Sequence, residues 1–138
     1  MKTVELNNIK YLNDPYPHCV IDNFFDIESA DKIYESVNSL KLESASYKFT
    51  NKGNLNEYNK FEYSKIGRLP LTLKDVFIYL NSKEFVAKIE KLTGISNLIY
   101  EDCNLQGAGV HIIKNEGFLN MHTDFNTYDN PTHGKLDR

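Results

Sequence analysis

The apolar positions of the chain recur at helical spacing in three segments. Between residues 27 and 40 they return every three or four positions, and Asp26 or Ser29 can cap the start. A second such pattern follows Pro70, and a third begins after Ser82 and stops at Gly94. We therefore predict three amphipathic helices, and we expect the first to pack one face on a sheet.

Other segments have the composition of strands. Residues 17–25 mix β-branched and aromatic side chains after two prolines, which predicts an extended entry into a strand. Residues 98–113 alternate irregularly around Gly107 and Gly109, which indicates two extended pieces with a bulge or a close backbone approach. Residues 117–125 again have strand-like spacing. Helices and strands together predict the α+β class.

Two segments have no clear period. Residues 44–69 are rich in Asn, Lys and aromatic side chains, so they fit either a strand with a loop or a partly ordered surface loop whose aromatic rings touch the core. Residues 127–134 have the composition of a turn-rich loop.

Length and composition exclude several classes of protein. A chain of 138 residues with 41% hydrophobic content suits a single domain with one core. The 16 basic and 19 acidic residues form no long block of one sign, so nucleic acid is not an expected partner. Cys19 and Cys103 lack a CxxC spacing and are expected to be buried thiols. Without a signal-peptide pattern or an apolar run near ~20 residues, we expect a cytoplasmic protein that does not enter the membrane.

The segment around His122 carries the candidate chemistry. His122 and Asp124 are two residues apart, and on a strand their side chains would leave the same face roughly 6 to 7 Å apart. An imidazole and a carboxylate on one face can converge on one metal ion, as in the facial triad of non-haem Fe(II) enzymes. A turn is the alternative, because this spacing also arises by chance.

The wider motif resembles a known family. A glycine-rich strand entry at Gly107 and Gly109, then His111, then Gly117-Phe118-Leu119, then His122-x-Asp124 and finally residues 135–138 occur in one order. This order resembles the 2-oxoglutarate- and Fe(II)-dependent oxygenases related to prolyl 4-hydroxylase. Residues 15–25 are similar to the opening strand of that family, and residues 80–95 to the helix that precedes its barrel.

The resemblance implies a fold and a site. The fold would be a partial double-stranded β-helix, jelly-roll or cupin-like, flanked by N-terminal helices. His122 and Asp124 would hold Fe(II), and 2-oxoglutarate would be the co-substrate, with ascorbate as a candidate reductant. His111 lies where the family often places a Tyr or His that hydrogen-bonds the co-substrate. The family's distal His and its carboxylate-binding basic residue would fall beyond position 138, so residues 1–138 are expected to be the N-terminal part of one oxygenase domain, inactive alone.

Other interpretations stay open. His133, in a Pro-Thr-His-Gly stretch, is expected to be a solvated loop residue. The chain could also be a non-catalytic binding module built on the front half of the barrel, or a metal-binding protein whose site is completed by a second subunit. We expect self-association through the unfinished sheet. The hydroxylation substrate is not indicated by the sequence.

Overall fold

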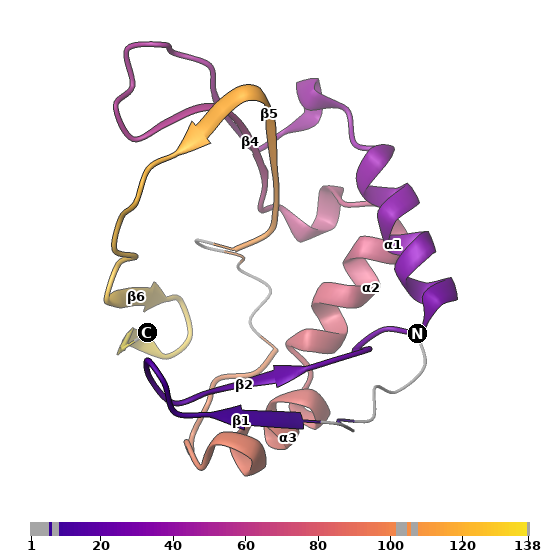
Figure 1. Cartoon of the computed structure of the whole chain (residues 1–138), viewed down its shortest axis with the longest axis vertical. Coiled ribbons are helices and arrows are strands. Elements are labelled where there is room, and N and C mark those ends of the chain that lie inside the picture. Colours follow the sequence, from indigo (N-terminus) through magenta and orange to yellow (C-terminus); the bar gives the residue numbers. More distant parts are fainter. Residues whose placement is uncertain (1–5, 7–8, 102–104, 106–107, 138) are drawn as a thin grey trace. The chain divides into compact units, whose positions relative to one another are not determined.

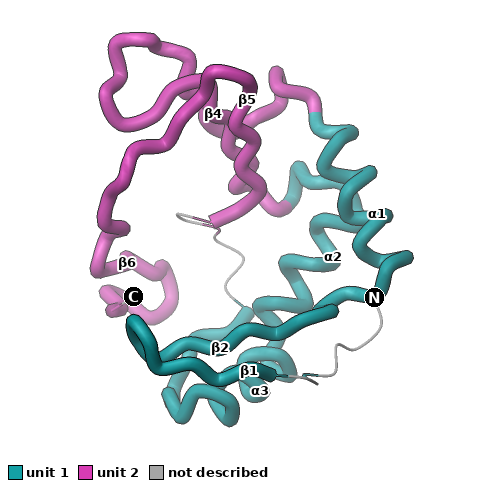
Figure 2. The backbone as a smooth tube through the Cα atoms, viewed as in Figure 1, with its two compact units in different colours: residues 1–40, 67–103 teal, residues 41–66, 104–138 magenta. Residues whose placement is uncertain are grey.

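The computed structural model describes residues 6, 9–101, 105 and 108–137 of the chain. They form helices and small antiparallel sheets, which confirms the α+β class (Figure 1). By its internal contacts the chain divides into two compact units, residues 1–40 with 67–103 and residues 41–66 with 104–138 (Figure 2). Each unit is therefore made of two separate stretches of sequence.

A two-stranded hairpin opens the first unit. β1 (Ile9–Leu12) pairs antiparallel with β2 (His18–Ile21), with Ile9 opposite Ile21. β2 confirms the strand predicted within residues 17–25. β1 was not predicted, because its four residues are too few to show a period and three of them are exposed.

The first predicted helix begins and ends close to its expected bounds. α1 (Ile27–Asn38) starts at Asp26, whose carboxylate accepts a 2.7 Å hydrogen bond from the backbone N–H of Ser29. The prediction that α1 packs on a sheet was wrong, because it packs against the helix α2 (Leu71–Leu80). A single ten-residue helix covers a narrower face than a sheet, so Ile27 and Tyr34 of the apolar stripe stay 83% and 68% exposed.

The third helix has both of its predicted caps. α3 (Lys83–Thr93) starts at Ser82, whose hydroxyl accepts a hydrogen bond from the backbone of Phe85, and it ends at Gly94 with a left-handed φ of 74°. The Phe85 ring lies 5.8 Å from the ring of Phe24 and 5.3 Å from that of Tyr79. This aromatic cluster ties α3 to the end of α2 and to the segment after β2.

A three-stranded sheet organises the second unit. Its strand order is β3 (Tyr47–Phe49), β4 (Glu57–Tyr63) and β5 (Val110–Leu119), all antiparallel. Residues 44–69 thus contain a hairpin, flanked by the short 3-10 turns η1 (Leu42–Ser44) and η2 (Ile66–Arg68). Phe61 and Tyr63 of β4 are buried and form the core of this unit with Leu105.

The pairing of β4 with β5 is interrupted once. The register shifts between Tyr58 and Lys60, where Asn59 has a left-handed φ of 49° and its side-chain amide donates a 2.9 Å hydrogen bond to the carbonyl of Asn115. Such a bulge increases strand twist and turns side chains to a new face. Glu57 and Lys60 can therefore share a face although they are three residues apart.

The close backbone approach predicted near the glycines is confirmed at Gly109. A Cβ atom built there would lie 2.5 Å from the carbonyl oxygen of Tyr63, and φ is 130°. Gly107, the other glycine of that prediction, lies outside the described residues.

Two predictions for the C-terminal segment were wrong in part. The strand expected over 117–125 ends at Leu119, and residues 120–125 have no regular structure. The loop expected over 127–134 is a hairpin of β6 (Thr127–Asn130) and β7 (Gly134–Asp137). Its turn is stabilised by the side-chain oxygen of Asn130, which accepts hydrogen bonds from the backbones of Thr132 and His133.

Candidate functional site

The segment after β5 is fixed to the β3–β4 loop through Asn120. The backbone N–H of Asn120 donates a 2.8 Å hydrogen bond to the carbonyl of Asn56, and its side-chain amide donates to the carbonyl of Leu55. These two bonds hold the chain immediately before His122. His122 and Asp124 therefore follow a residue that is hydrogen-bonded to the β3–β4 loop, although they are not themselves on a strand.

The His122 ring is oriented by the backbone of the same segment. Its Nδ1 lies 2.8 Å from the carbonyl oxygen of Asn120. Because a carbonyl only accepts, Nδ1 must carry the proton. In a neutral imidazole the lone pair is then on Nε2, and this arrangement is the usual one for a histidine that binds metal.

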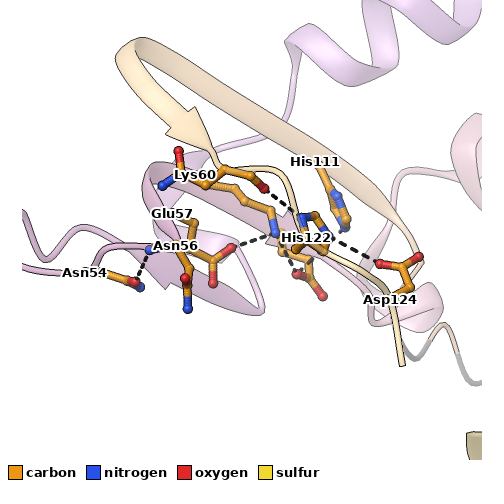
Figure 3. Close-up of polar contacts among 9 residues, drawn as sticks. Asn54, Asn56, Glu57, Lys60, His111, His122 and Asp124 are labelled. Atoms are coloured by element: carbon orange, nitrogen blue, oxygen red, sulfur yellow. Dashed lines mark hydrogen bonds and ion pairs between the residues drawn. The ribbon is translucent and has the colours of Figure 1, made fainter. Parts of the chain in front are cut away.

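The side chains of His122 and Asp124 lie close together, although not on a strand as the sequence predicted. Nε2 of His122 lies 3.3 Å from Oδ1 of Asp124, and the two side chains are 49% and 63% exposed (Figure 3). With Nε2 unprotonated, a lone pair would face a carboxylate oxygen, and a proton or a cation between them removes that repulsion. Two donors 3.3 Å apart subtend an angle of about 100° at an ion with bonds of about 2.1 Å, so the pair fits adjacent positions of one metal.

His111 lies on β5, directly opposite Glu62 of β4. Nε2 of His111 is 3.7 Å from Oε2 of Glu62, and the imidazole is 35% exposed. The carboxylate therefore faces one ring nitrogen and leaves the other one unengaged by this contact. Figure 3 shows His111 in the same view as the His122 pair.

A buried lysine beside His111 was not singled out from the sequence. Lys60 has a side chain only 9% exposed, and its ammonium lies 2.9 Å from Glu57, 3.8 Å from Glu62 and 5.0 Å from the centre of the Phe49 ring. Two carboxylates thus share one ammonium on one face of the sheet. The sequence does mix three charged residues with aromatic ones between positions 57 and 63. No regular period identified that stretch as a strand, so a shared face for the charged residues could not be predicted.

The other histidines and the two cysteines lie elsewhere in the sequence. His133 lies in the β6–β7 turn, as expected of a loop histidine. His18 is on β2, with Nδ1 2.8 Å from the carbonyl of Tyr16. Cys19 is a half-buried free thiol, and Cys103 lies outside the described residues.

The ligand set is incomplete as the structure has it. Within residues 6, 9–101, 105 and 108–137, no three His, Cys, Asp or Glu side chains lie close enough to hold one ion. In that same part of the chain, no helix is long and apolar enough to cross a membrane.

Comparisons with family models, curated proteins and solved structures found no match to this chain. Any function assigned to it therefore depends on its own residues and on the motif that they form.

Proposed function

We propose that this chain carries the proximal metal ligands of an Fe(II)- and 2-oxoglutarate-dependent dioxygenase, a hydroxylase of the prolyl 4-hydroxylase type. The observation that supports the proposal best is the His122–Asp124 pair, with 3.3 Å between its two donor atoms. The hydrogen bond from His122 to the Asn120 carbonyl adds the tautomer that metal binding needs. In this proposal the small sheets are parts of a double-stranded β-helix.

The chemistry of such a site is shared between cofactor and protein. Fe(II) and 2-oxoglutarate would supply oxygen activation, in a reaction that converts 2-oxoglutarate, O₂ and a C–H bond to succinate, CO₂ and a C–OH group. His122 and Asp124 would hold the ion through Nε2 and a carboxylate oxygen. Asn120 would orient the imidazole through its carbonyl and fix the segment through its bonds to residues 55 and 56.

His111 has two candidate roles in this proposal. It can contact the co-substrate, as the resemblance implies, or it can bind the ion. Glu62 lies beside the ring in either role, with its carboxylate oxygen 3.7 Å from Nε2.

Metal binding by the chain is the first test. Co(II) serves as a spectroscopic substitute for Fe(II), and we expect an absorption band that is lost in His122→Ala and in Asp124→Asn. His133→Ala is the matched control, since it removes an imidazole from the β6–β7 turn and should leave the band unchanged. Equal Co(II) spectra for wild type and both ligand variants would contradict the proposal.

Turnover is the second test. Succinate release is measured on the natural full-length product with Fe(II), ascorbate and oxygen, and the His122→Ala, Asp124→Ala double variant should release none. Binding of Co(II) without any succinate release would favour the alternative of a metal-binding or interaction module.

A further inference from the structure

The loop between β3 and β4 contains two turns of the same kind. The side-chain oxygen of Asn51 accepts a 2.9 Å hydrogen bond from the backbone N–H of Gly53, and that of Asn54 accepts one of the same length from Asn56. Such a bond holds the backbone two residues on in a fixed turn. Figure 3 shows the second of these bonds in the same view as His122.

The turn at Asn54 fixes the two carbonyl groups that hold Asn120. The N–H of Asn56 and the C=O of Leu55 belong to one planar peptide group, so the bond to Asn54 sets the direction of that carbonyl. The Leu55 carbonyl accepts the side-chain amide of Asn120, and the Asn56 carbonyl accepts its backbone N–H at 2.8 Å. Both acceptors of Asn120 therefore lie within two residues of Asn54.

The sheet holds the same loop from its other end. Glu57 follows Asn56 at the start of β4 and lies opposite Leu119, and its carboxylate is 2.9 Å from the Lys60 ammonium. The loop carbonyls are thus fixed by the strand on one side and by the turn on the other. Without the turn, the Leu55 peptide would be free to rotate, because its 82% exposed side chain does not restrain it.

We propose that Asn54 is a positioning residue for the His122–Asp124 pair. It acts through the two loop carbonyls that hold Asn120, whose own carbonyl accepts the 2.8 Å hydrogen bond from Nδ1 of His122. The orientation of Asn120 thus decides where the lone pair on Nε2 points. This inference deepens the proposed function and rests on it, because the direction of that lone pair matters for activity only if the pair binds a metal.

Long-range ¹H–¹⁵N NMR of the His122 imidazole tests this chain of contacts without metal. In wild type the neutral ring should carry its proton on Nδ1. In Asn54→Ala the share of this tautomer should fall, and the backbone N–H of Asn120 should exchange about fivefold faster, the effect of losing about one hydrogen bond. Asn54→Asp keeps an acceptor oxygen and should restore both values.

Asn51→Ala is the matched control. It removes a bond of the same kind and length from the same loop, but the turn at Asn51 ends before residues 55 and 56. The His122 tautomer and the exchange of Asn120 should stay at their wild-type values, although urea unfolding should show similar losses of stability for Asn51→Ala and Asn54→Ala. A purely structural role of Asn54 would leave the His122 ring as unchanged as the control does.

Co(II) titration measures the effect on the site itself. Asn54→Ala should lower the Co(II) affinity about threefold to tenfold, less than the roughly 10- to 100-fold typical when a partner bonded directly to a metal ligand is lost. Asn54→Asp should recover the affinity, and Asn51→Ala should bind like wild type.

The possible results separate the two proposals. If Asn54→Ala matches Asn51→Ala in both the His122 tautomer and the Co(II) affinity, the strand alone positions Asn120, and the inference is wrong while the proposed function stands. If His122→Ala binds Co(II) as wild type does, the proposed function is wrong, and the metal-free tautomer and exchange data still decide whether Asn54 positions His122.

Discussion

The side-chain amide of Asn59 in β4 donates a 2.9 Å hydrogen bond to the carbonyl oxygen of Asn115 in β5. This bond crosses the bulge at the point where the register of the two strands shifts. The bond therefore links β4 to β5 next to the part of the sheet that carries Lys60, Glu62 and His111.

Replacing Asn59 by alanine should destabilise the protein by about 2 kcal/mol. About half of this loss comes from the missing hydrogen bond. The other half arises because alanine disfavours the left-handed φ of 49° at this position. Asn97→Ala is the control, because Asn97 has a φ of 62° in the loop after α3, outside any strand, and should cost only about 1 kcal/mol. Urea unfolding measures both, and equal losses would mean that the bond to Asn115 contributes nothing.

Replacing Lys60 by methionine should be more costly, at about 3 kcal/mol. The carboxylates of Glu57 and Glu62, 18% and 13% exposed, would lose the ammonium that they share. Lys114→Met in the exposed part of β5 is the matched control and should change the free energy of unfolding by less than about 0.5 kcal/mol. A Lys60→Met protein as stable as the control would show that the buried charges are compensated in another way.

The stability of the protein should fall at alkaline pH through Tyr63. Burial raises the pKa of Tyr63 above its ordinary value of 10.0, and the charge of Glu43 adds to the effect. Because the folded state binds the phenol proton more tightly, the contribution is complete below pH 10.0 and is lost as pH rises through the higher folded pKa.

Tyr63→Phe isolates this contribution. The variant lacks the 3.0 Å hydrogen bond to the Lys41 carbonyl, so near neutral pH it should be about 1 kcal/mol less stable. The difference from wild type should shrink above pH 10.0, measured as the urea midpoint against pH. A constant difference at all pH values would contradict the assignment.

Gly109→Ala should disrupt the start of β5. The new Cβ atom would lie 2.5 Å from the Tyr63 carbonyl oxygen at a φ of 130°, and we expect a loss of about 3 kcal/mol. At Gly67 nothing lies within 4 Å of the corresponding atom, so Gly67→Ala should stay within about 0.5 kcal/mol of wild type. Thermal unfolding compares the two, and a tolerated Gly109→Ala would refute the close approach.

We also expect self-association at the free side of β5. This ten-residue strand pairs with β4, and no other strand in the described part of the chain pairs with it. The unpaired backbone groups of a long edge strand can pair with a strand of another chain. A lysine on the edge disfavours this pairing. Light scattering should show a mass that rises with concentration in wild type and less so in Leu119→Lys, whereas a monomer of 16.0 kDa at every concentration would contradict the expectation.

The helices were predictable because their signals are local. Asp26, Ser82 and Gly94 each fix a helix end through atoms no more than four residues away, and such pairs can be found in a sequence. The hairpin of β3 and β4 was not predictable in the same way, because its partner strand β5 lies far along the chain and its buried lysine breaks the apolar alternation.

Only the contact within the candidate pair could be anticipated from the sequence. His122 and Asp124 meet as expected, but they do so in an irregular segment held by bonds from Asn120 to residues 55 and 56, which only the folded chain reveals. The facing of Glu62 and His111 likewise depends on the register of β4 and β5. That register includes a shift between Tyr58 and Lys60, which no local sequence pattern predicts.

The interleaving of the two units has a consequence for synthesis. Tyr63 pairs with Val110, so β4 leaves the ribosome well before the strand that completes its sheet. At about 5 to 20 residues per second, translating the residues between them takes roughly 2 to 9 s. During that interval the nascent β3–β4 hairpin has an open edge beside Phe61 and Tyr63, and it is then most exposed to pairing with the wrong strand.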